Sequence, residues 1–256
     1  MKKMTSLYSF LLFFLIMLSW ESIVRMQQVP ELILPKPTVI ITNLYTNLMS
    51  GYFTVHIYTT LIEVMGGFVL GSCLGIGLGF IVAQSKRVKE ILHPYIIASQ
   101  AMPKLALAPL LILWFGYGFL PKILITALIS FFPLFESTVA GLSHVDKDKL
   151  SLFRSLRASA LNILLKLRLP VAVPYIFSGL RVAVVLSVVG AVVSEFIGAN
   201  QGLGAVITTA MGMMDTPLMF SSFVLLTTIG IVLYQSIYFA ERLWLKKYYY
   251  ARRNDL

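Results

Sequence analysis

Charged residues are scarce in this sequence of 256 residues. Asp, Glu, Lys and Arg make up only 12% of it, and hydrophobic residues make up 58%. Soluble domains carry about twice that share of charge, so too few charges remain to cover a surface facing water. The composition excludes a disordered chain and argues against an ordinary cytosolic enzyme. Cysteine is almost absent: Cys73 stands alone, which excludes an intramolecular disulfide, and no Cys/His group has the spacing of a structural zinc site.

The sequence contains long apolar runs with few charged residues. A membrane helix needs about 20 mainly apolar residues, and we predict an all-α polytopic membrane protein with about six transmembrane helices. The six segments are 7–24, 58–83, 91–115, 123–142, 174–197 and 218–240. The first follows Lys2 and Lys3, so a signal peptide is an alternative, but Glu21 and Arg25 come after it where a cleavage site would need small residues.

Positive charge is distributed unevenly along the chain. The 21 Lys and Arg exceed the 11 Asp and Glu, which gives a formal net charge of +10. With a cytoplasmic N-terminus, sixteen of the 21 fall in cytoplasmic segments, and only Arg25, Lys36 and Lys122 fall on the opposite side. This bias predicts that both termini are cytoplasmic. It accounts for the net charge without a nucleic-acid partner and places the protein in the cell (cytoplasmic) membrane.

Glycines recur at every fourth position in the second segment. The four form a stripe on one helix face: Gly67, Gly71, Gly75 and Gly79. Small residues let another membrane helix approach closely, so we predict a packing surface whose partner lies in this chain or in a second copy. Cys73, in the same segment, is expected only to pack.

Prolines break the chain after the first segment, at Pro30, Pro35 and Pro37. The apolar spacing over 38–50 then predicts a short helix on the outer surface, with a surface loop as an equal alternative. We divide the chain into a first span with this external helix (1–53), a transmembrane domain (54–245) and a basic cytoplasmic tail (246–256).

The stretch 144–173, between the fourth and fifth segments, is too charged to cross a membrane and too apolar for a solvated linker. Asp146 and Asp148 suit a helix start because carboxylates complement the helix dipole. Ser159 can cap a second short helix over 160–167, which Leu169-Pro170 and Pro174 would end. Two interpretations stay open: a structured loop without a partner, or a docking element that presents leucines and a phenylalanine to a cytoplasmic protein.

The same stretch carries a spaced motif. Ser151-Leu152-Phe153 is followed, after Arg154-Ser155-Leu156, by Arg157, and nine residues later comes Leu167-Arg168-Leu169-Pro170. This spacing resembles the coupling loop of permease subunits of bacterial ATP-binding-cassette (ABC) importers: Glu-Ala-Ala, three residues, Gly, nine residues, Ile-x-Leu-Pro. Leu169 and Pro170 match it. Ser151, Leu152, Phe153 and Arg157 replace the acidic residue, the small pair and the glycine.

The resemblance extends over about residues 55–240 and is greatest to the group that handles nitrate, sulfonates, taurine and thiamine precursors. Other matching stretches are Leu107-Ala108-Pro109-Leu110, Trp114-Phe115-Gly116, Gly179-Leu180-Arg181, Glu195-Phe196-Ile197-Gly198-Ala199-Asn200 and Gly202-Leu203-Gly204. It implies a pathway-forming subunit that pairs with a second copy of itself. Two ATP-binding subunits would dock on the loops 144–173, and an extracytoplasmic solute-binding protein would deliver solute.

No Gly-x4-Gly-Lys-Ser/Thr phosphate loop occurs in the chain, so ATP is not expected to bind here in that way. ATP and Mg would belong to the partner subunit. We therefore expect no catalytic residue, no metal site and no cofactor in this chain.

Ionisable residues inside the predicted spans are costly and usually face a cavity or a partner. Lys104 is expected to pair or to face water, Arg181 to lie inside or to snorkel to the interface, and Glu63 to be interfacial. By family analogy Glu195 lies near the external mouth of the pathway, with an interfacial carboxylate as the alternative. Glu136 stands mid-span beside Ser137, where an apolar residue is expected. It either pairs with Lys104 or Arg181, or lines the path and favours a neutral or cationic solute.

Two other classes of membrane protein fit the sequence less well. An ion-coupled secondary transporter would use the intramembrane carboxylates, but six spans are few and no inverted repeat is visible. A membrane enzyme would need a nucleophile–base or metal constellation inside the spans, and the sequence has none. The solute is expected to be a thiamine or pyrimidine precursor, because Glu136 suits an anion path poorly; a sulfonate or nitrate stays open.

Overall fold

The structure, a computed structural model, describes the backbone of residues 2–254 and their side chains except those of 2–6, 86, 93, 97 and 247–254. The basic side chains expected at Lys2, Lys3, Lys86, Lys247, Arg252 and Arg253 lie outside the described residues. The described backbone contains helices and turns. The helices are α1 (Lys2–Met26), α2 (Pro37–Met49), α3 (Tyr52–Ala83), α4 (Lys86–Ala101), η1 (Lys104–Leu107), α5 (Ala108–Phe115), α6 (Phe119–Ser143), α7 (Lys147–Ser155), α8 (Ala160–Ile163), η2 (Leu164–Arg168), α9 (Leu169–Phe196), α10 (Leu203–Gly212) and α11 (Thr216–Asn254).

Five helical stretches are long and apolar enough to cross a membrane, and a bent pair makes a sixth if it counts as one span. This confirms the predicted all-α membrane fold. The segment 91–115, which we predicted as one membrane helix, is broken: α4 and the η1–α5 unit meet at 76°. The break lies at Met102-Pro103, where both residues are extended. A residue before proline avoids the helical conformation, which gives the bend its cause.

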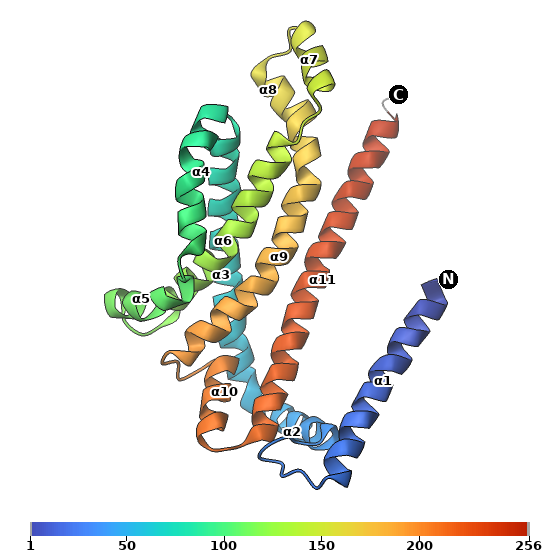
Figure 1. Ribbon diagram of the computed structural model, residues 1–256, viewed down its shortest axis with the longest axis vertical. Helices are drawn as coiled ribbons and strands as arrows, with labels where there is room; N and C mark the ends of the chain where they lie inside the picture. The colour runs from blue at the N-terminus through green and yellow to red at the C-terminus, as the bar shows by residue number, and fades with distance from the viewer. Residues whose placement is uncertain (1, 255–256) are drawn as a thin grey trace.

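The helices alternate in direction (Figure 1). α1 leads to α2 at one end of the molecule, α3 runs back, and the hairpin of α7 and α8 projects at the opposite end between α6 and α9. α10 lies beside α2 at the first end, and α11 returns towards the end that carries α7 and α8. Both chain termini therefore point away from the α2–α10 end, as a six-span protein with both termini on one side requires.

The glycine stripe of α3 packs against α6 of the same chain. A Cβ atom at Gly67 would lie 2.3 Å from the Thr126 Cβ, and one at Gly71 would lie 2.2 Å from the Ser130 Oγ. At Gly75 and Gly79 the nearest atoms are α6 carbonyl oxygens at 2.7 and 2.9 Å. Only glycine permits this approach of the two backbones. Cys73 lies away from the contact, and its side chain is exposed.

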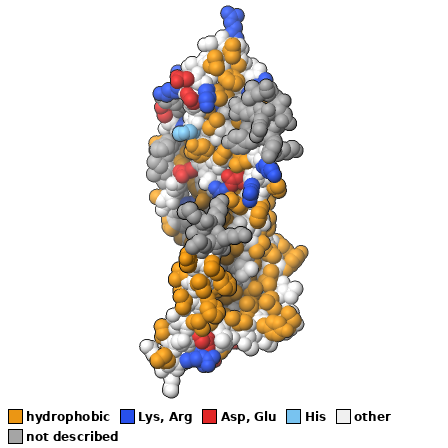
Figure 2. Space-filling model, turned by 90° about the vertical axis from the view of Figure 1, so that its right-hand side faces the viewer, with side chains coloured by type: hydrophobic (Ala, Val, Ile, Leu, Met, Phe, Trp, Pro, Cys, Tyr) orange, Lys and Arg blue, Asp and Glu red, His pale blue; other side chains and the backbone are white. Residues whose placement is uncertain are grey.

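α1 stands apart from the bundle (Figure 1) and meets it at one end. There Val24 is fully buried, Trp20 packs against Phe220 of α11, and the Glu21 carboxylate accepts hydrogen bonds from Thr38 of α2. The helix predicted over 38–50 is thus present as α2. Figure 2 shows the charged side chains of one face gathered in the upper part and at the lower tip, with a mainly hydrophobic zone between them.

Candidate functional site

The hairpin of α7 and α8 is built from local caps. The Asp146 carboxylate accepts a hydrogen bond from the Asp148 N–H at 2.9 Å, and the Ser159 hydroxyl accepts one from the Asn162 N–H at 3.3 Å. Both starts were predicted from the sequence. The helix predicted over 160–167 was expected to end at Leu169-Pro170. Instead, α8 continues through a π turn, Leu164–Arg168, directly into α9. Pro170 has no N–H to donate. The wider π turn directly before it tolerates the missing hydrogen bond.

Arg157 adopts a left-handed conformation between α7 and α8, with φ +52°. The Ala158 N–H donates to the Phe153 carbonyl at 3.0 Å and the Arg157 N–H donates to the Arg154 carbonyl at 2.9 Å. This pair of bonds is a Schellman cap, which usually has glycine at the left-handed position. Arg157 thus takes a left-handed conformation at the position where the motif of the resembling family has glycine.

The hairpin exposes apolar side chains. Leu152 is 58% exposed, Leu156 71% and Leu161 62%, whereas Phe153 is half-buried. Leu169 and Pro170 are half-buried at the start of α9, and Ser151 and Arg157 are exposed. Leucines gathered at a projecting tip are typical of a surface that another protein covers.

A second cluster lies at the break of the third span. The Lys104 ammonium sits 4.3 Å from the centre of the Phe132 ring and donates to the Gln100 carbonyl at 3.3 Å. The Gln100 side-chain amide donates to the Glu136 carboxylate. Glu136 is exposed and Lys104 is half-buried. Sequence reasoning missed Gln100 and Phe132, although Phe132 lies four residues from Glu136 on the same face of α6.

The ion pairs predicted for Glu136 are not formed among the described side chains. Arg181 instead pairs with Glu241 of α11, and both side chains are largely shielded from solvent. Lys104 is held by Gln100 and Phe132. Ser137 faces α9, where a Cβ atom at Gly179 would lie 2.7 Å from its hydroxyl oxygen. Glu136 and Ser137 thus lie on different faces of α6.

A third cluster binds the start of α10 to α3 and α9. Glu195 is fully buried, and its carboxylate accepts hydrogen bonds from the Thr60 hydroxyl at 2.6 Å and the Gly204 N–H at 2.5 Å. Thr60 in turn accepts from the Leu203 N–H at 2.8 Å, and His56 Nδ1 accepts from the Gly202 N–H at 3.2 Å. Three free N–H groups at a helix start thereby find acceptors on other helices. Glu195 is thus part of a buried network at the α10 end, and its expected place near the external mouth of the pathway stays a prediction.

Glu63 extends the same network to α6. Its side chain is fully buried among the helices, and Lys122 Nζ lies 2.7 Å from its Oε1 atom. Its Oε2 atom has no hydrogen-bond partner among the described residues. His56, Thr60 and Glu63 recur at helical spacing on one face of α3, a polar stripe that could have indicated the network.

Two glycines make room for the Glu195 carboxylate. Gly202 has φ +118°, and a Cβ atom there would lie 2.2 Å from Glu195 Oε1. A Cβ atom at Gly204 would lie 2.7 Å from Oε2. The Gly-Leu-Gly stretch is therefore explained by close approach of a buried carboxylate.

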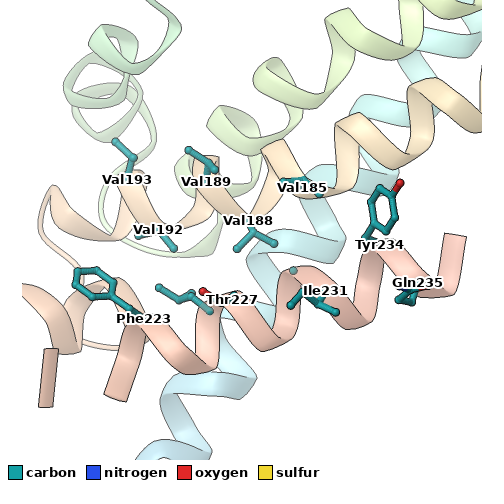
Figure 3. Close-up of a pocket in the computed structure, with 12 residues that line it drawn as sticks. Val185, Val188, Val189, Val192, Val193, Phe223, Thr227, Ile231, Tyr234 and Gln235 are labelled. Atoms are coloured by element: carbon teal, nitrogen blue, oxygen red, sulfur yellow. The ribbon is translucent and has the colours of Figure 1, made fainter. Parts of the chain in front are cut away.

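A groove of about 510 Å³ lies between α9 and α11. Figure 3 shows Val188 and Val192 of α9 pointing towards α11, which contributes Phe223 and Ile231 to the lining. Thr227, Tyr234 and Gln235 supply its few polar atoms. The lining suits lipid or a packed helix better than a polar solute.

Comparison with known proteins gives one answer. Residues 71–247 match the family model described as "Binding-protein-dependent transport system inner membrane component". The riboflavin transport system permease protein RibX of Chloroflexus aurantiacus is 35% identical over 90% of this chain and 85% of its own length. The formylaminopyrimidine transport permease protein ThiX of Halalkalibacterium halodurans is 35% identical over 93% and 95%.

Among solved structures, an amino acid ABC transporter crystallised with histidines superposes with a TM-score of 0.61 at 18% identity, over 80% of this chain and 97% of that one. This likeness supports the fold alone. The family match covers well over half of the chain, and the two relatives cover nearly all of it. The chain therefore belongs to the inner-membrane permease subunits of binding-protein-dependent ABC transporters and is not itself the ATPase of such a system.

Proposed function

We propose that this permease forms the solute pathway of an ATP-driven importer as a dimer with a second copy of itself. Two ATP-binding subunits dock on α7–α8, and a solute-binding protein delivers solute at the α10 end. The observation that carries the proposal is the α7–α8 hairpin, whose exposed leucines project beyond the bundle on a locally capped support. ATP and Mg act in the partner subunit.

The orientation follows from charge. The α7–α8 end carries six Lys and Arg between residues 147 and 168, and the positive-inside bias puts this end and both termini in the cytoplasm. In a variant with Cys73 replaced by serine, a cysteine at Ser143 should react only from the cytoplasm and one at Gln201 only from outside. Reaction of position 143 from outside would overturn this orientation.

The dimer rests on the exposed face of α9. This helix packs on α3, α6, α10 and α11, yet Val182, Val185 and Val189 remain 40–50% exposed along one stripe. A central helix with a free apolar stripe suits a contact with the same helix of a second copy. A cysteine at Val185 should cross-link two copies, and cross-linking at the lipid-facing Leu12 of α1 alone would contradict this arrangement.

The solute belongs to the small organic molecules that relatives carry. A pyrimidine precursor is favoured over a sulfonate or nitrate, because the exposed Glu136 carboxylate repels an anion. Relatives named for formylaminopyrimidine and riboflavin support this choice.

Reconstitution tests the function. The permease is placed in vesicles with an ATPase and a solute-binding protein of its transport system, and ATP is supplied inside or outside. We expect uptake that requires ATP on the α7–α8 side and persists when ion gradients are dissipated. Uptake by the permease alone, driven by a proton or sodium gradient, would show the ion-coupled secondary transporter instead.

A further inference from the structure

The break in the third span brings polar side chains together at a place outside the buried core clusters. α4 stops at Ala101 because Met102 and Pro103 are extended. In a continuous helix the Gln100 carbonyl would accept the N–H of residue 104. Here it accepts the Lys104 ammonium at 3.3 Å. At the break, the Lys104 ammonium replaces a backbone N–H as the donor to the Gln100 carbonyl. This contact holds the charge of Lys104 beside α6.

Two pairs of side chains face each other across α4–η1 and α6. Gln100 and Lys104 lie four residues apart on one side, and Phe132 and Glu136 lie four residues apart on the other. The Gln100 amide donates to Glu136, and the Lys104 ammonium lies over the Phe132 ring at 4.3 Å. Each charge is therefore held by a neutral partner and not by the opposite charge.

This arrangement leaves bonding capacity unused. An ammonium group has three donors and a carboxylate has two acceptor oxygens. One donor of Lys104 serves Gln100, and one oxygen of Glu136 accepts from the Gln100 amide. No further partner for either group is recorded among the described side chains. Glu136 is exposed and Lys104 half-buried, so both can reach a molecule beside them.

The depth of the site bears on its role. Glu136 lies seven residues before the end of α6, roughly 10 Å along the helix axis from the α7 end. A charged carboxylate at that depth must face water, a partner or a solute, because lipid exposure is costly. The face of α6 turned to α3 is already occupied by Thr126, Ser130 and Thr138. Glu136 lies on another face of α6, where it is exposed and contacts Gln100 of α4.

From these contacts we infer, on the basis of the proposed importer function, that Gln100, Lys104, Phe132 and Glu136 form a solute-recognition site for a planar, net-neutral heteroaromatic molecule carrying an amino group next to a ring nitrogen. Glu136 accepts the amino N–H, Lys104 donates to the ring nitrogen, and the ring stacks near Phe132. A simple anion is attracted by the Lys104 ammonium but repelled by the Glu136 carboxylate, so the site rejects sulfonates and nitrate.

A zwitterion such as taurine is the sharpest competitor, since it also offers a donor and an acceptor. It has no ring to stack near Phe132. The Phe132 ring therefore distinguishes the two classes of ligand. Its removal should weaken the binding of a heteroaromatic ligand and leave the binding of a zwitterion unchanged.

The test is equilibrium binding to the complete permease–ATPase complex in nanodiscs, with labelled formylaminopyrimidine, riboflavin, taurine and an aliphatic sulfonate as probes. We expect saturable binding of formylaminopyrimidine, and weaker binding of riboflavin, whose ring system carries no amino group. Glu136→Gln, Lys104→Met and Phe132→Leu should each weaken formylaminopyrimidine binding at least tenfold. Glu31→Gln, which alters an exposed carboxylate outside the spans, should leave it unchanged and serves as the matched control.

The outcomes separate this inference from the proposed function. Failure of the complex to assemble and hydrolyse ATP would count against the importer itself. If the complex assembles but formylaminopyrimidine does not bind, or its binding is insensitive to Glu136→Gln, the site assignment is overturned. Saturable taurine binding that depends on Glu136 and Lys104 but not on Phe132 would likewise overturn the heteroaromatic class.

Discussion

The two ends of the molecule stabilise their short helices in opposite ways. At the α7–α8 hairpin each helix start is capped by a residue two or three positions away, Asp146 for α7 and Ser159 for α8. At the start of α10 the acceptors include Thr60 and His56, which are 143 and 146 residues away in sequence. Local caps leave the hairpin surface free for a partner. Remote caps tie α10 into the bundle and make that end depend on buried polar contacts.

The largest expected effect is on assembly. Leu156→Asp should abolish co-purification of the ATPase, because an unpaired charge would enter an apolar contact. The permease itself should keep its membrane level and its thermal midpoint, since Leu156 is 71% exposed in the free subunit. Pull-down and thermal unfolding in nanodiscs measure the two effects. Leu156→Met is the control, and recovery of ATPase at the wild-type yield with the aspartate variant would contradict docking at the hairpin.

The opposite result is expected at the α10 end. Glu195→Ala removes the acceptor for the Thr60 hydroxyl and the Gly204 N–H, leaving two buried donors unsatisfied. Each such donor costs about 1–3 kcal/mol, so we expect a loss of about 3–5 kcal/mol in unfolding free energy. Thermal unfolding against Glu31→Ala, an exposed carboxylate, measures it. A change smaller than that of the control would mean that the network does not stabilise α10.

Lys122 provides a test within the same network. Lys122→Met strands the buried Glu63 carboxylate, whose second oxygen already lacks a partner among the described residues. Breaking a buried pair in this way costs about 3 kcal/mol. Adding Glu63→Gln should restore much of the lost stability, because the stranded charge is removed. A double-mutant cycle on unfolding free energies gives the coupling, and strictly additive losses would exclude an energetic link between the two side chains.

These contrasts also explain how far the sequence could be interpreted. Apolar runs, glycine spacing and the caps at Asp146 and Ser159 are local patterns, so the spans, the α3 packing stripe and the hairpin could be predicted. The break at Met102-Pro103 was missed because length and hydropathy do not register a bend within an apolar run. The partners of Glu195 and Glu63 were missed because they come together only when α3, α6, α9 and α10 pack. The position of Glu195 near the end of a span does not determine its burial, which comes from contacts with α3 and α10.

The smallest expected effect concerns the turn of the hairpin. Arg157 holds φ +52°, which costs a residue with a side chain about 1 kcal/mol relative to glycine. Arg157→Gly should therefore stabilise the cap. The Ala158 N–H, bonded to Phe153, should exchange with solvent roughly fivefold more slowly, since about 1.4 kcal/mol corresponds to tenfold. Arg154→Gly, inside α7, should act in the opposite direction because glycine weakens a helix interior. Equal acceleration of exchange in both variants would show that the left-handed turn at Arg157 carries no strain, and that the local caps alone determine the stability of the hairpin.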